Sequence, residues 1–204
     1  MFTTADSEAY PDENSNGIPD DQEIDDSNLD LDGNGVSDVL QHDIRCLNTV
    51  IGDSQIGLKC HSGLDVEQIK SIDPDSIADK ENKPDDIAFG LISFKVKVAE
   101  PGDTAYVTVY LSEPAPAEAN WYRYDTTNGW YPYSHATFRG DDRSMVDLVL
   151  KDGGPDYGDV DGAKNGVIID TSGVGALTQT EPKPSGGGGG GGGCFIGTAS
   201  SWIY

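Results

Sequence analysis

The sequence predicts an all-β protein: an antiparallel β-sandwich that follows an acidic segment with calcium-binding loops and precedes a disordered glycine-rich tail. Three observations lead to this fold class. Apolar and polar residues alternate in short runs between residues 46 and 178, which is the period of a half-buried strand. Turns rich in glycine, asparagine and proline separate these runs, and no long helical pattern interrupts them. About eight short strands of this kind favour an antiparallel sandwich.

Each expected element follows from a local pattern. The clearest strand is 92–98, where every second residue is apolar. Asn128-Gly129, between two aromatic runs, predicts a tight hairpin turn. The charged segment 73–86, which holds two prolines, predicts a surface loop. The expected strands are 92–98, 106–111, 120–124, 130–133, 145–151 and 166–170, with weaker ones at 48–51, 55–60 and 65–72.

The charge balance excludes several classes of partner. The chain has 204 residues, with 36 Asp and Glu against 13 Lys and Arg, and its net charge is −23. Nucleic acid is excluded because phosphate binding needs clustered basic residues. No apolar run reaches the roughly 20 residues of a membrane-spanning helix. The first residues lack the basic and apolar regions of a signal peptide, so we expect that a leader was removed or that the chain is a fragment.

Composition divides the chain into four expected segments. An acidic head covers residues 1–45, where 13 Asp and Glu stand against a single basic residue, Arg45. The sandwich follows at 46–178. A linker at 179–193 ends in eight consecutive glycines, which can bury nothing, and a short tail covers 194–204.

The head contains a motif whose spacing predicts a calcium site. It fits the pattern Asp-x-Asp/Asn-x-Asp/Asn-Gly-x5-Glu in full. Calcium takes six to eight oxygen ligands, and this spacing turns alternate side chains inward while the glycine permits a sharp turn. The candidate ligands are Asp12, Asn14, Asn16, the carbonyl of Ile18, Asp20 and Glu23.

A second copy of the motif begins 18 residues later. Its twelfth position is Gln41, which supplies at most one neutral oxygen, so we expect a weaker site or one completed by Asp43. The alternative, an acidic loop that binds nothing, does not account for two copies. We therefore predict at least two bound Ca²⁺. The candidate ligands of the second loop are Asp30, Asp32, Asn34, the carbonyl of Val36, Asp38 and Gln41.

The flanks of these loops indicate stacked calcium loops, not EF-hands, because six residues between Glu23 and Asp30 cannot form two helices. Ser37 can cap a short helix that ends near Cys46 and docks the head on the sandwich. We expect the core of the sandwich not to depend on the head. The run from Asn16 to Glu23 and the tight spacing resemble thrombospondin type-3 repeats of bacterial surface proteins. That resemblance implies secretion to the bacterial cell surface and a calcium-stiffened spacer.

The segment 156–166 is a third turn rich in oxygen ligands. Four side chains there could converge on an ion: Asp159, Asp161, Asn165 and Asp170. The alternative is a pair of glycine-containing turns with solvated carboxylates.

Two of the three cysteines lie close in sequence. Cys46 and Cys60 are 14 residues apart in an acidic sequence of exported character, which suggests a disulfide. The alternative is two buried free thiols. Cys194 stands apart, behind the glycine tract.

Several ordered motifs in the middle of the chain resemble a known domain. Pro101-Gly102-Asp103-Thr104, then Trp121-Tyr122-Arg123-Tyr124-Asp125, then Gly158-Asp159-Val160-Asp161-Gly162 are similar to the choice-of-anchor U domain of bacterial exported proteins. After the glycine tract, Cys194-Phe195-Ile196-Gly197-Thr198-Ala199 resembles the CFI-box C-terminal sorting signal. Together these resemblances imply anchoring or processing at Cys194 by sorting machinery, and they bring no catalytic residue.

No catalytic arrangement emerges from the sequence. The three histidines, His42, His61 and His135, show neither paired spacing nor a nucleophile partner, so we expect a non-enzymatic protein. The predicted function is a calcium-binding surface module with a structural or adhesive role, whose partners are cell-surface or matrix components.

The alternative function is a carbohydrate-binding module of a larger secreted enzyme. It depends on an aromatic group in the hairpin that could stack on sugar rings if exposed, or pack in the core if buried. That group is Trp121, Tyr122, Tyr124, Trp130, Tyr131 and Tyr133.

Overall fold

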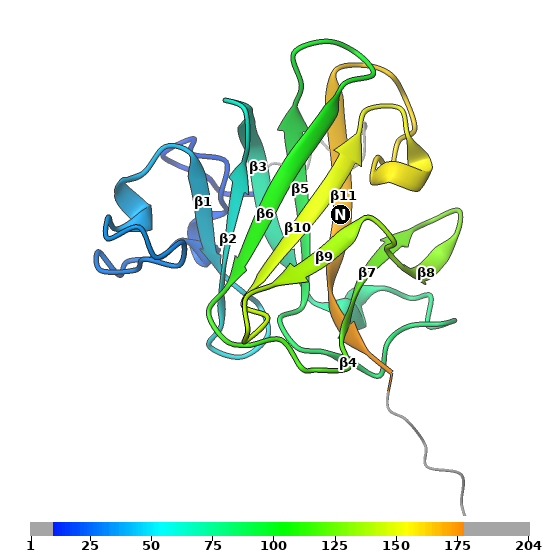
Figure 1. Cartoon of the computed structure of the whole chain (residues 1–204), viewed down its shortest axis with the longest axis horizontal. Coiled ribbons are helices and arrows are strands. Elements are labelled where there is room, and N and C mark those ends of the chain that lie inside the picture. The colour runs from blue at the N-terminus through cyan, green and yellow to red at the C-terminus, as the bar shows by residue number, and fades with distance from the viewer. Residues whose placement is uncertain (1–9, 178–204) are drawn as a thin grey trace, which may run out of the picture.

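A computed structural model of the chain describes residues 10–177, which form two antiparallel β-sheets (Figure 1). The linker at 179–193 and Cys194 lie outside the described residues. Sheet A has the order β1 (Ile44–Asn48), β2 (Gln55–Cys60), β6 (Thr104–Leu111), β10 (Met145–Lys151) and β9 (Ala136–Arg139). Sheet B has the order β3 (Asp65–Ile72), β5 (Leu91–Lys97), β11 (Val167–Ala176), β7 (Asn120–Asp125) and β8 (Gly129–Pro132), and β4 (Asp86–Ile87) pairs with β11. The predicted all-β fold class is confirmed.

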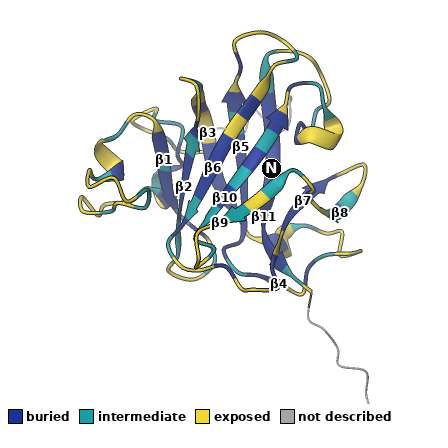
Figure 2. Cartoon of the chain, in the orientation of Figure 1, coloured by how far each residue is buried: buried dark blue, intermediate teal, exposed yellow. Residues whose placement is uncertain are grey.

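The core lies between the two sheets and follows from period-two alternation. On β10, Val146, Leu148 and Leu150 are at most 1% exposed, and the residues between them are more exposed (Figure 2). Leu148 lies opposite Val107 of β6 in the ladder, so the two strands present one apolar face. Burying a side chain of this size contributes roughly 1.5–3 kcal/mol.

A second, smaller cluster covers the outer face of sheet B. It contains Ile87, Leu91, Tyr124 and Trp130, with Ile77 of the segment 73–86 packed against them. The indole nitrogen of Trp130 donates to a backbone carbonyl of the same segment, at 2.8 Å. The predicted surface loop therefore also shields one end of the sheet.

Most of the segments predicted as strands are strands, but the predicted helix after Ser37 is wrong. The segment instead forms a three-residue 3-10 turn, η2 (Asp38–Leu40), and β1 begins at Ile44. Leu40 is 72% exposed, so this turn does not present a buried apolar face to the sandwich. Pairing of β1 with β2 instead satisfies the backbone, and this strand replaces the expected one at 48–51. The short strands β4 and β9 were not predicted.

The predicted disulfide is also wrong: both thiols are free and buried. Cys46 lies opposite Gly57 in the ladder, and Cys60 lies three positions further along β2. Because side chains alternate between faces, an odd offset puts the two thiols on opposite faces of sheet A. Cys60 belongs to the inner core, where burial raises the pKa of its thiol to about 12.

The described part of the acidic head, which begins at Tyr10, packs on the open edge of the sandwich beside β1 and β3 (Figure 1). Ile18 is 7% exposed and belongs to the main core. The amide of Ile69 on β3 donates to the carbonyl of Gly17, and Gln22 makes two hydrogen bonds with the backbone of Ser71. The expectation that the sandwich core is independent of the head is therefore not met.

Among residues 10–177, no helix has the length and apolar character that crossing a bilayer requires.

Candidate metal centre

The two motif loops have the same backbone, displaced by 18 residues. Their glycines are both left-handed, with φ of 86° at Gly17 and 83° at Gly35. Each loop continues into a 3-10 turn, η1 (Asp20–Gln22) or η2. The first amide of each turn closes the loop by donating to the carbonyl that precedes the motif: Asp20 to Pro11 at 2.8 Å and Asp38 to Leu29 at 2.7 Å.

The carboxylate that opens each motif is oriented by the loop itself. Asp12 accepts from the amides of Asn16 and Gly17, at 3.1 and 2.9 Å. Asp30 accepts from the equivalent amides of the second loop, at 3.0 and 2.9 Å. These side-chain-to-backbone bonds are local, which explains why the motif reproduces the same turn twice.

In the first loop the predicted ligands converge on Glu23. Carboxylate oxygens of Asp12, Asp20 and Glu23 all lie within 4.8 Å of one another. The amides of Asn14 and Asn16 each donate to Oε1 of Glu23, at 2.7 Å. Because an amide also carries an oxygen, both side chains can offer an oxygen ligand at this place. A set made only of oxygen donors fits a hard cation such as Ca²⁺.

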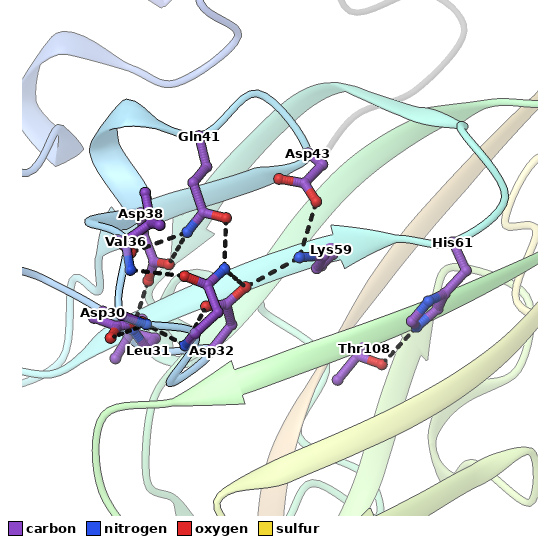
Figure 3. A network of polar contacts seen from close by, with 12 residues as sticks. Asp30, Leu31, Asp32, Val36, Asp38, Gln41, Asp43, Lys59, His61 and Thr108 are labelled. Atoms are coloured by element: carbon purple, nitrogen blue, oxygen red, sulfur yellow. Dashed lines mark hydrogen bonds and ion pairs between the residues drawn. The ribbon is translucent and has the colours of Figure 1, made fainter.

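The second loop also gathers three carboxylates, of Asp30, Asp32 and Asp38, within 4.8 Å. Burial raises the pKa of Asp38. The twelfth position differs, however, because the Gln41 amide nitrogen donates to the carbonyl of Val36 at 3.1 Å and to Asp38 at 3.0 Å (Figure 3). Groups expected to bind the ion are therefore hydrogen-bonded to an amide.

A lysine from the sandwich completes this arrangement. The ammonium of Lys59, on β2, lies 3.0 Å from Asp32 and 2.9 Å from Asp43 (Figure 3). Its hydrogen bonds with these two carboxylates raise the pKa of Lys59, and the same contact lowers the pKa of Asp43. Asp43, which was expected to complete the second site, binds the lysine instead. The sequence did not single out Lys59, because nothing local connects it to the loop.

A cavity of about 340 Å³ separates the two loops. Asn14 and Glu23 line it from the first loop, and Asp38 and Gln41 line it from the second. The Glu23 end of the first loop is therefore open to solvent through this cavity, which gives a cation a route of entry.

The third predicted site does not form. Asp159 is fully buried and accepts from the amides of Gly153 and Ile169, at 2.7 and 3.2 Å. Asp170 instead forms a buried ion pair with Arg123 and accepts from Ser172. A metal site needs at least three acidic, histidine or cysteine side chains close together. Within residues 10–177, such groups occur only in the two motif loops. Asn165 does donate to Asp161, at 3.0 Å, but Asp159 and Asp170 bind the other partners named above, so the four candidates do not converge on one point.

The hairpin aromatics pack inside the protein. Trp121 and Trp130 are each 2% exposed, and Tyr122, Tyr124 and Tyr133 are also buried. Tyr131 is partly buried, and its hydroxyl accepts from Arg123 at 2.9 Å. The aromatic group on which the carbohydrate alternative depended therefore does not form an exposed stacking surface.

No protein-family model, curated protein or solved structure matches the chain.

Proposed function

We propose that the protein is a calcium-binding, non-enzymatic extracellular module in which the first loop holds Ca²⁺ and fastens the acidic head to the sandwich. The observation that carries this proposal is that carboxylate oxygens of Asp12, Asp20 and Glu23 lie within 4.8 Å of one another. The residues that would hold the ion are Asp12, Asn14, Asn16, the carbonyl of Ile18, Asp20 and Glu23. A bound Ca²⁺ supplies positive charge that offsets the repulsion among these carboxylates.

The role that follows is structural. Ile18 is both a candidate ligand, through its carbonyl, and a member of the sandwich core, through its side chain. An ion bound there would couple the order of the loop to the packing of the core. The resemblances to thrombospondin type-3 repeats, to the choice-of-anchor U domain and to a CFI-box signal support a bacterial surface location and an adhesive role. Cys194 would then be the point of anchoring.

Calorimetric titration tests the calcium site directly. Extracellular calcium modules commonly bind with Kd of about 10⁻⁴–10⁻³ M, and we expect the first loop in this range. Glu23→Gln removes the closing carboxylate and should raise Kd at least about tenfold. Glu81→Gln is the matched control, because it removes the same charge from an exposed position on the segment 73–86.

Thermal unfolding provides a second readout. Because the first loop packs into the core, calcium should shift a single cooperative transition of the whole fold. At 5 mM Ca²⁺ and a Kd of about 10⁻⁴ M, linkage predicts about 2 kcal/mol of added stability. No heat of binding at millimolar calcium, together with identical melting in chelator, would contradict the proposed function.

A further inference from the structure

The second loop already contains a positive charge that the fold supplies. Lys59 belongs to β2, and its ammonium lies between Asp32 and Asp43. The Asp32 side chain is only 3% exposed and that of Lys59 22%, so water screens this pair only partly.

The outer face of β2 brings the loop to the lysine. Gly57 lies two residues before Lys59 on the same face, and a Cβ there would lie 3.4 Å from Leu31 of the second loop and 2.9 Å from Ile44. The missing side chain allows Leu31 to pack against the strand. Asp32, the next residue, is thereby placed within reach of Lys59.

The amide of Gln41 binds two further oxygens of the loop. It donates to the carbonyl of Val36 and to Asp38, which are the seventh and ninth positions of the motif. Asn34 donates to the side-chain oxygen of Gln41 at 2.8 Å. With Lys59 on Asp32, four of the positions expected to bind calcium therefore have side-chain nitrogen donors from the chain itself. A metal ion would have to displace these donors and lie beside an ammonium that repels it.

The first loop also has amide donors, because Asn14 and Asn16 both donate to Glu23, but it has no internal cation. Its twelfth residue, Glu23, is a carboxylate and cannot donate a hydrogen bond when ionised. Among the ion pairs of the described part of the chain, none involves Asp12, Asp20 or Glu23. The same backbone therefore lacks an internal cation in one copy and contains one in the other.

We propose that Lys59 and Gln41 take the place of a metal ion in the second loop, so that the chain binds a single Ca²⁺, in the first loop. The second loop is then held closed without calcium. Lys59 determines the calcium stoichiometry, although it lies outside both motifs. The part of this proposal that concerns the first loop rests on the proposed function; the part that concerns Lys59 does not.

Calcium titration of the variants tests the stoichiometry. Wild-type protein should bind one equivalent. The double variant Lys59→Met/Gln41→Glu, which removes the ammonium and restores the twelfth carboxylate, should bind two. Lys97→Met is the matched control, because it removes an exposed lysine from β5, and it should still bind one. Two equivalents in the wild type, or one in the double variant, would overturn the inference and leave the proposed function standing.

Hydrogen exchange in chelator tests the second loop without any binding step. The amides of Asp20 and Asp38 occupy equivalent positions and make equivalent hydrogen bonds. We expect Asp38 to stay protected in chelator and Asp20 to gain at least about tenfold protection only when calcium is added. Lys59→Met should remove at least about tenfold of the Asp38 protection, whereas Lys97→Met should not. Equal protection of Asp38 in the wild type and Lys59→Met would contradict the role of Lys59, even if no calcium bound to either loop.

Discussion

The two motif loops have the same backbone but different surroundings. The first inserts Ile18 into the sandwich core, where it is 7% exposed, while the equivalent Val36 of the second loop is 50% exposed. The twelfth residue of the first loop is a carboxylate, Glu23, whereas that of the second loop is an amide, Gln41. The second loop also forms an ion pair with Lys59 of β2. A motif therefore specifies the turn, and the residues packed around it decide whether that turn needs a metal ion or supports the core.

The largest expected difference concerns the two motif glycines. A Cβ on Gly17 would lie 2.3 Å from the backbone carbonyl of Glu67, whereas a Cβ on Gly35 would meet nothing within 4 Å. Gly35→Ala should cost only the left-handed backbone strain, about 1–2 kcal/mol. Gly17→Ala adds a clash with a strand and should cost more than about 4 kcal/mol in urea unfolding. Equal losses would show that the first loop does not dock on β3.

Truncation of the seventh motif residue should give the next largest effect. Ile18→Ala removes buried methyl groups from the core and should cost about 2–4 kcal/mol. Val36→Ala removes an exposed side chain and should change the free energy of unfolding by less than about 0.5 kcal/mol. Chemical unfolding in chelator separates this packing effect from any effect on calcium. A small loss for Ile18→Ala would mean that the head is not part of the core.

The segment 156–166, the third turn rich in oxygen ligands, is expected to have a smaller effect on stability, and this effect depends on pH. Burial raises the pKa of Asp159 to about 6, and nearby Asp152 and Asp161 add to this. The protonated form is therefore favoured by folding. Its contribution is fully present below the unfolded pKa of about 4 and is lost as pH rises through about 6. Between pH 4 and pH 7 this group should remove on the order of 2 kcal/mol of stability.

The measurement is urea unfolding across that pH range in chelator, with Asp159→Asn as the reference. The variant leaves one backbone amide facing an NH₂ group, which costs stability at every pH, but it cannot titrate. The difference between the two proteins should shift by on the order of 2 kcal/mol across the range. A constant difference would show that Asp159 ionises normally in the folded protein.

The sequence by itself determined the parts of this protein that depend on near neighbours. In both loops the first carboxylate, Asp12 or Asp30, accepts from amides four and five residues further along, so the turn depends only on near neighbours. Strands 55–60, 65–72 and 145–151 were also predicted with their observed bounds, because alternation is a property of the strand itself. The hairpin turn at Asn128-Gly129 was also predicted, because a turn depends on a few consecutive residues.

Only the tertiary structure decided which groups far apart in the chain meet. Lys59 reaches Asp32 across 27 residues, and Arg123 reaches Asp170 across 47. Neither contact has a local signature, because each depends on which strands are neighbours and on which face each side chain lies. The same dependence on strand register puts Cys46 and Cys60 on opposite faces of sheet A and brings Asp170 to Arg123. Charge and spacing along the chain identify candidate ligands, whereas strand pairing and packing decide which of them come together.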